Sequence, residues 1–278
     1  MSPTGADDAE LQTFVQVMKA RHGYDFGEYA PASFKRRVRG LCRRANAGSI
    51  AELTRRIERE PAFLRQVLAG LSVPVSEMFR DPWVFELLRR EVLPVLASYP
   101  RIHIWQAGCA HGEEVYSLAI LLQEEGLYDK AQIFATDFND VALEEAAEGI
   151  YPAAHVALFA ENYRRAGGTG SLSQYFHSRY GRIKFDESLK RAMIQYRPLN
   201  LLHDFAQLGT FDIIFCRNVL IYFNDSLQDR VLRLFRDSLV NKGFLCLGSK
   251  ESLSNTSVGG DFQAFDAAAR IYRRRAPA

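Results

Sequence analysis

The feature that most constrains the fold is an alternation that begins at Arg101. Short apolar segments (RIHIW, QIFATD, FDIIFC and GFLCLG) are separated by longer amphipathic ones (EEVYSLAILLQEEG, DVALEEAAEGIY and SLQDRVLRLFRDSL). Strands that alternate with helices of ten or more residues are typical of a parallel sheet with helices on both faces. The sequence therefore predicts a doubly wound α/β fold, in which ligands bind beyond the carboxyl ends of the strands.

One interval interrupts this alternation. After the glycine-rich GGTG at 167–170, the runs GRIKF and RAMIQYRPL flank the polar turn DESL. Two apolar runs on either side of a polar turn predict an antiparallel hairpin. We therefore expect a small β-subdomain inserted at about residues 172–198. The segment AFDAAARIYRRR is expected to add a final antiparallel strand at the edge of the sheet.

The first 70 residues have a different pattern, with apolar positions at helical spacing in LQTFVQVMKA and AELTRRIEREPAFLRQVLAGL. This predicts a helical N-terminal domain over residues 1–70, with breaks near Gly23, Gly40, Gly48 and Gly70. The segment LSVPVSEMFRDP contains two prolines and predicts an extended linker over residues 71–82. The α/β domain then occupies residues 83–278 and opens with the helix WVFELLRREVLPVL.

Composition limits the kind of protein this can be. The chain has 278 residues, of which 47% are hydrophobic and 24% charged, and its formal net charge is +2. No apolar run approaches the roughly 20 residues of a membrane span, and the N-terminus shows no signal-peptide pattern. Four separated cysteines without CxxC, and six histidines without HExxH, favour free thiols and no metal site. We expect a cytoplasmic, monomeric protein that does not insert into membranes.

The turn after the first strand, WQAGCAHGEEVYSLA, contains Gly108 and Gly112 but is not GxGxxG. Glu113 and Glu114 stand at the start of the next helix, where they would repel the pyrophosphate of a dinucleotide. A cofactor that carries positive charge and no phosphate, such as S-adenosyl-L-methionine, fits this turn better. Alternatively, both glutamates only complement the helix dipole from solvent.

Other polar residues also follow predicted strands. Asp137 ends QIFATD about 25 residues after the glycine turn, close to the spacing at which an acidic residue accepts from ribose hydroxyls. It could instead cap the next helix, a role that Asn139 or Asp140 could share. Arg217 and Asn218 directly follow FDIIFC. An arginine beside such an apolar run is rarely buried without a partner, although a strand-ending cap remains an alternative.

Taken together, AGCAHGEEVYSLA, ATD, NLL, FCRNVLIYF and EMFRDP resemble the CheR-type chemotaxis methyltransferases. The resemblance spans nearly the whole chain and implies a Rossmann-like class I methyltransferase fold. It also implies methyl transfer from S-adenosyl-L-methionine to glutamate side chains of chemoreceptors, with S-adenosyl-L-homocysteine as the second product. The cofactor-binding residues that it implies are Ser76, Arg80, Glu113, Glu114, Asp137, Asn200, Leu201, Arg217 and Asn218. Either Glu113 or Glu114 could be the one that contacts the cofactor.

The same resemblance suggests roles in catalysis for Arg80, which would orient a carboxylate, and Tyr222, which would line the methyl-transfer site. A glutamate side chain has a reference pKa of about 4.3, so the nucleophile is already ionised at neutral pH and needs no general base. The linker departs from the family pattern at Pro74 and Met78. That departure leaves open a second hypothesis, a non-catalytic module that binds the cofactor and docks receptors. An NAD-dependent oxidoreductase is disfavoured by the acidic turn.

A basic stretch between residues 31 and 51 contains six basic residues and no acidic one. Lys35, Arg39 and Arg43 recur at i, i+4 and i+8, which places them along one stripe of a helix. From the resemblance, we expect these three residues and Arg36 to face the glutamate-bearing helices of a chemoreceptor. A solvated basic face is the alternative, and nucleic-acid binding is disfavoured because no aromatic residues interleave.

The predicted hairpin resembles the small β-subdomain with which some members of the family capture a receptor's C-terminal peptide by adding a strand. Those members tend to carry a longer glycine-rich loop than the short YFHSRYGRIKF of this chain. We therefore expect that tight docking of a receptor tail peptide is absent.

Overall fold

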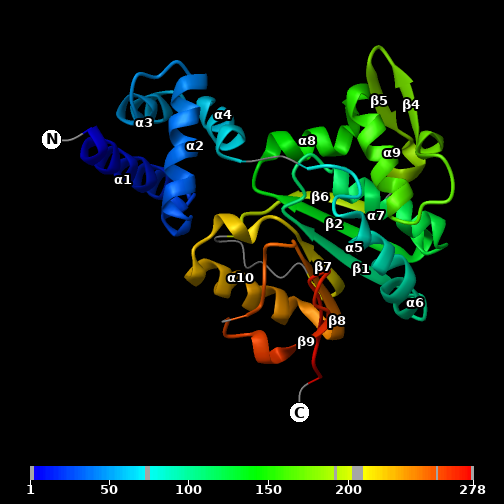
Figure 1. Ribbon diagram of the computed structural model, residues 1–278. Helices are drawn as coiled ribbons and strands as arrows, with labels where there is room; N and C mark the ends of the chain where they lie inside the picture. Colours follow the sequence, from blue (N-terminus) through cyan, green and yellow to red (C-terminus); the bar gives the residue numbers. More distant parts are fainter. Residues whose placement is uncertain (1–2, 73–75, 191–192, 202–208, 255, 277–278) are drawn as a thin grey trace.

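A computed structural model describes residues 3–72, 76–190, 193–201, 209–254 and 256–276, and confirms the α/β fold (Figure 1). Within these residues, a seven-stranded sheet has the order β6-β2-β1-β7-β8-β10-β9. Its strands are β1 (Ile102–Ala107), β2 (Ala131–Asp137), β6 (Ile194–Pro198), β7 (Phe211–Cys216), β8 (Leu239–Leu247), β9 (Phe262–Asp266) and β10 (Ile271–Arg274). The neighbours from β6 to β8 all pair in parallel, and β7 is buried along its whole length.

Helices cover both faces of the sheet, as the alternation predicted. The helices of the α/β domain are α5 (Pro82–Leu87), α6 (Leu93–Leu96), α7 (Glu113–Glu124), α8 (Asp140–Glu148), α9 (Val156–Arg165) and α10 (Asp225–Ser238). A π-helical turn over Leu88–Val92 joins α5 to α6. One large apolar cluster contains side chains of α5–α7 and the small sheet, and a second contains those of α10 and the N-terminal helices.

The N-terminal domain consists of α1 (Pro3–His22), α2 (Pro31–Arg44), α3 (Ile50–Arg59) and α4 (Phe63–Leu71). Figure 1 shows this domain in blue beside the carboxyl ends of the strands. It joins the α/β domain through an isolated bridge between Tyr29 and Phe223 and a hydrogen bond from the Ala30 amide to the Tyr222 carbonyl. The predicted break at Gly40 is wrong, because Gly40 lies inside α2.

The predicted pairing of GRIKF with RAMIQYRPL is also wrong. GRIKF forms β5 (Arg182–Phe185), which lies between β4 (Phe176–Arg179) and β3 (Ile150–Pro152) in a separate antiparallel sheet. The described part of RAMIQYRPL forms β6, which runs parallel to β2 at the edge of the central sheet. Apolar alternation does not specify a partner strand, and Ile194 is buried beside Ile133 of β2 rather than in the small sheet.

The C-terminal segment AFDAAARIYRRR contributes to two antiparallel strands instead of one. Its first three residues end β9, which is the outer strand of the sheet as predicted, and Ile271–Arg274 form β10, which lies between β8 and β9. In the predicted linker, Leu71, Ser72 and the residues from Ser76 onward are described, whereas Pro74 lies outside the described residues. No helix in the described part of the chain has both the length and the apolar character needed to cross a membrane.

Candidate active site at the carboxyl ends of the strands

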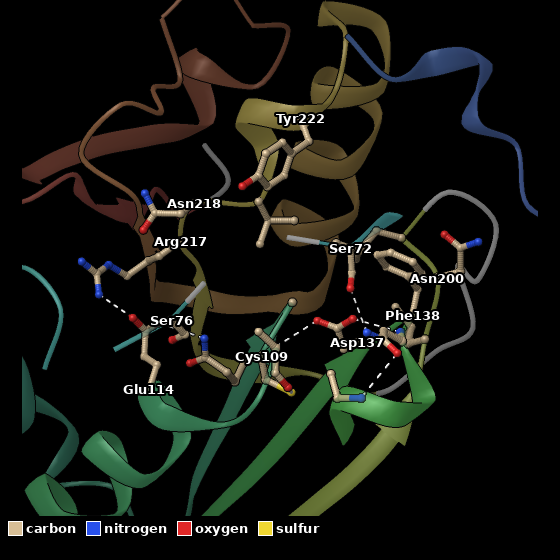
Figure 2. Close-up of a pocket in the computed structure, with 18 of the residues that line it drawn as sticks. Ser72, Ser76, Cys109, Glu114, Asp137, Phe138, Asn200, Arg217, Asn218 and Tyr222 are labelled. Atoms are coloured by element: carbon tan, nitrogen blue, oxygen red, sulfur yellow. Dashed lines mark hydrogen bonds and ion pairs between the residues drawn. The ribbon is translucent and has the colours of Figure 1, made fainter. Parts of the chain in front are cut away.

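A cavity of about 950 Å³ opens beyond the carboxyl ends of β1, β2 and β7, where it meets the N-terminal domain (Figure 2). The cavity brings together all the cofactor-binding and catalytic residues predicted from the sequence except Glu113. Those that line it are Ser76, Arg80, Glu114, Asp137, Asn200, Leu201, Arg217, Asn218 and Tyr222.

The glycine turn shapes the floor of this cavity. Gly108 has a φ of +75°, and a Cβ built on it would lie 2.5 Å from Cγ2 of Val219, which also lines the cavity. Gly112 has a φ of +89° and starts α7, where a Cβ would lie 2.8 Å from the Cβ of Ala146. Both positions therefore require glycine, because a side chain would be strained and would collide. The turn leaves room for a ligand beside the ends of the strands.

Asp137 stands at the end of β2 with its carboxylate held by backbone amides. Its Oδ2 accepts from the Ala110 amide at 3.0 Å, and its Oδ1 accepts from the Asn139 amide at 3.0 Å. Burial raises the pKa of Asp137, while these amides oppose that rise. The side chain of Asn139 caps α8 by accepting from Val141 and Ala142. The capping role therefore belongs to Asn139, and Asp137 is left to line the cavity.

The two glutamates of the turn have different surroundings. Glu114 lines the cavity; its Oε1 accepts from Gln106 Nε2 at 2.9 Å, and its Oε2 lies 2.5 Å from Arg217 Nη1. Glu113 is buried and hydrogen-bonds Ser76, and its Oε2 has no hydrogen-bond partner among the described residues. Burial raises the pKa of Glu113 to about 7. Of the two glutamates, only Glu114 lines the cavity, so we propose Glu114 as the one that contacts the cofactor.

Arg217 is buried because two carboxylates surround it. Its side chain is 1% exposed, and its Nη2 lies 2.7 Å from Asp81 Oδ2 and 3.1 Å from the carbonyl oxygen of Arg80. Burial alone would lower the pKa of Arg217, but Glu114 and Asp81 outweigh it and raise the pKa. By formal charge, the two carboxylates and one guanidinium of this triad leave an excess of negative charge beside the cavity. A cationic ligand would complement that charge.

Asn218 lies in the left-handed region with a φ of +61°, in the turn after β7. This turn is held by Glu251, a buried residue that the sequence analysis did not single out. The Glu251 carboxylate accepts from the amides of Asn218 at 3.0 Å, Ile221 at 3.3 Å and Gly248 at 2.6 Å. Asn218 and Ile221 lie 33 and 30 residues from Glu251 in the chain, so no local pattern indicates these two contacts.

Arg37 is a second residue that sequence reasoning missed. Its guanidinium carbon lies 4.4 Å from the ring centroid of Tyr222 and 5.7 Å from that of Tyr29, and all three residues line the cavity. Arg37 also donates to the Leu71 carbonyl at 3.1 Å. The sequence pattern could have indicated that Arg37 points inward. Arg37 lies at helical spacing between the buried Phe34 and Leu41, on the apolar face of α2.

The predicted basic stripe is divided between two faces of α2. Lys35 forms an ion pair with Asp8, and Arg39 forms one with Asp7, both residues of α1. Arg36 and Arg43 instead line a groove between α2 and α4, which we call the arginine groove. The residues of the arginine groove are Arg36, Arg37, Gly40, Arg43, Arg44, Ala69, Gly70 and Ser72. Arg37 and Ser72 also line the cavity, so the groove adjoins it.

These residues fit S-adenosyl-L-methionine. The Asp137 carboxylate is available to ribose hydroxyls, the acidic triad suits the ammonium and sulfonium groups, and Arg80 can match the cofactor's carboxylate. Gly108 lines the cavity without a side chain, and a Cβ there would collide with Val219. Within the described ranges, no three His, Cys, Asp or Glu side chains gather as a metal would require.

Comparison with known proteins agrees with a site for S-adenosyl-L-methionine. Residues 9–72 match the all-alpha domain of CheR methyltransferases, and residues 74–269 match the S-adenosylmethionine-binding domain of CheR methyltransferases. The fold and the cavity thus define an S-adenosylmethionine-dependent methyltransferase. More particularly, the chain belongs to the CheR methyltransferase family.

Individual relatives cover the chain almost from end to end. A Pseudomonas putida protein named Cher3, whose assignment as a methyltransferase is provisional, is 42% identical over 267 residues, which are 96% of this chain and 97% of that protein. Chemotaxis protein methyltransferase 1 of Pseudomonas aeruginosa is 31% identical over 261 residues, which are 90% of this chain and 92% of that protein. Among solved structures, the N-methyltransferase NodS of Bradyrhizobium japonicum in complex with S-adenosyl-L-homocysteine is 14% identical, with a TM-score of 0.41. That match covers 73% of this chain and 90% of NodS.

Proposed function

We propose that this protein transfers a methyl group from S-adenosyl-L-methionine to glutamate side chains of a chemoreceptor or a related signalling protein, forming methyl esters. The observation that carries the proposal is the arginine groove, which adjoins the cofactor cavity at Arg37 and Ser72. A cationic groove beside a methyl-transfer site suits an acidic protein segment. The names of the chemotaxis relatives point to the same substrate class.

Methyl transfer to a glutamate requires the protein to orient the reacting groups and does not require a general base. The bound cofactor supplies an electrophilic methyl group, and an ionised glutamate already carries the lone pair that attacks it. The new oxygen–carbon bond forms as the carbon–sulfur bond breaks, so no proton moves. The protein must hold the carboxylate in line and remove its water, which can contribute several kcal/mol to the rate.

We assign these tasks to three residues of the cavity wall. Arg37 and Arg80 are cations that can attract a substrate or cofactor carboxylate. Tyr222 lies under Arg37 and provides an apolar ring beside the site. The Ala30 amide, which donates to the Tyr222 carbonyl at 2.9 Å, ties this residue to the N-terminal domain. The two domains would thereby build the methyl-transfer site jointly.

Turnover separates this proposal from the alternative, a non-catalytic module that binds cofactor and receptor. Purified protein is incubated with cofactor labelled in its methyl group and with a cytoplasmic receptor fragment. We expect label in the fragment that base treatment releases as methanol, and expect Asp137→Ala to abolish it without unfolding the chain. Cofactor and receptor binding without incorporation would favour the docking module.

The absence of tight tail-peptide docking also remains a proposal. The hairpin between β4 and β5 turns at Tyr180 and Gly181, both at positive φ, which is a minimal connection. Calorimetry with a receptor tail peptide should detect no micromolar binding. Such binding, lost when β4 is disrupted, would refute this proposal.

A further inference from the structure

Gln106, the penultimate residue of β1, is a buried amide at the cavity wall with an unused acceptor. It is 2% exposed and lines the cavity. Its Nε2 donates to Glu114 Oε1, whereas its Oε1 makes no hydrogen bond to any atom of the described residues. A buried polar atom without a partner is costly, so it usually marks the place of a ligand or a water.

The orientation of this amide is fixed by its neighbour. Turning the side chain over would place Oε1, rather than Nε2, against the Glu114 carboxylate, and two acceptors would then face each other. Oε1 therefore has to lie on the side away from Glu114 Oε1. Glu114 Oε2 is already bound to Arg217, so this carboxylate alone offers a cationic ligand few free acceptor positions.

An ammonium group carries three N–H donors and needs more than one acceptor. We propose that Gln106 is a cofactor-binding residue whose Oε1 accepts a hydrogen bond from the α-ammonium group of S-adenosyl-L-methionine, beside Glu114. Gln106 supplies a neutral acceptor where a further carboxylate would repel Glu114 and Asp81. This inference concerns the cofactor alone, so it does not depend on which group accepts the methyl.

Calorimetry on the full chain tests the proposed contact of Gln106 with two ligands, of which only one carries the α-ammonium group. S-adenosyl-L-homocysteine carries the ammonium, and 5′-methylthioadenosine lacks the whole amino-acid part. Gln106→Met keeps the size of the side chain and removes the acceptor. We expect this variant to bind S-adenosyl-L-homocysteine about tenfold more weakly, as for a hydrogen bond to a charged group, and to bind 5′-methylthioadenosine as the wild type does.

Two controls separate direct contact from indirect effects. Gln132→Met, at a half-buried position of β2 that does not line the cavity, should leave both affinities unchanged. If Gln106 only orients Glu114, adding Gln106→Met to Glu114→Gln should not lower the affinity for S-adenosyl-L-homocysteine any further. If Gln106 contacts the ammonium group directly, the affinity should fall in the Glu114→Gln background as well. Gln106→Ser, whose hydroxyl is too short to reach, provides a second variant if Gln106→Met does not fold.

Two outcomes would overturn the inference. Equal weakening for both ligands would show that Gln106 supports the cavity or holds a water molecule. Unchanged affinity for S-adenosyl-L-homocysteine would show that Oε1 does not contact the ammonium group.

Discussion

Arg217 and Glu114 form a buried ion pair, with 2.5 Å between Nη1 and Oε2, that joins the turn after β7 to the start of α7. Asp81, at the start of α5, adds a second carboxylate to the same guanidinium. Three separate parts of the chain thus meet at one charged group behind the cavity. Because two carboxylates share one cation, this part of the cavity wall carries an excess of negative charge for a cationic group, whereas Arg37 and Arg80 line other parts of the cavity.

This geometry predicts that the two glutamates of the glycine turn differ in cofactor binding. Glu114→Gln keeps a carbonyl oxygen for Arg217 but removes the charge at the cavity, so the affinity for S-adenosyl-L-methionine should fall about tenfold, equivalent to about 1.4 kcal/mol. Glu113→Gln should bind the cofactor within about twofold of the wild type. Calorimetry on the two matched variants decides, and a larger loss for Glu113→Gln would contradict the assignment.

Glu113 should instead control how stability depends on pH. Its pKa is raised by burial from an ordinary value of 4.5 to about 7, so the folded protein binds this proton more tightly than the unfolded chain does. Its stabilising contribution is complete below pH 4.5 and is lost as pH rises through about 7. Glu113→Gln mimics the protonated form and cannot titrate.

The free energy of unfolding of the wild type, relative to Glu113→Gln, should therefore fall by roughly 3 kcal/mol between pH 4.5 and pH 8. Urea denaturation of both proteins across this range measures the difference. A difference that stays constant with pH would show that Glu113 is ionised throughout.

Arg37 should affect methyl transfer much more than cofactor binding. Arg37→Ala removes the cation above Tyr222 and should lower kcat/KM for the protein substrate at least about tenfold, with cofactor affinity within about threefold. Arg56→Ala is a matched control, because Arg56 lies over the Phe63 ring at 4.0 Å within the N-terminal domain. Steady-state methylation and calorimetry would refute this role if cofactor affinity fell as much as turnover.

The division of the basic stripe predicts unequal effects on substrate binding. Arg36→Ala and Arg43→Ala, in the arginine groove, should each raise KM for an acidic receptor fragment about threefold, and more at low salt. The Lys35→Ala, Arg39→Ala double variant should have a smaller effect, because Asp8 and Asp7 already pair with these cations. KM values measured at two salt concentrations test this. A larger effect for the double variant would place the substrate on the α1 side of the helix.

The sequence predicted the parallel strands β1, β2, β7 and β8 and most of the residues that line the cavity, because residues that follow apolar strands converge at one edge of a sheet. It did not predict β3, which lies at the end of a segment with a helical pattern, or β4. It could not choose between Glu113 and Glu114, since adjacent helical residues differ by about 100° and the phase depends on packing. It also missed contacts between distant segments. β6 pairs with β2 rather than with its neighbour in sequence, and Glu251 reaches the turn at Asn218.

The most direct test of the account is to map the methyl group after a reaction with a receptor fragment and S-adenosyl-L-methionine. Fragmentation mass spectrometry locates the added group on a single side chain. The account predicts methyl esters on glutamates of the fragment, which appear with wild-type protein and disappear with Asp137→Ala. Methyl groups on nitrogen, or no transfer by a protein that binds the cofactor, would contradict it.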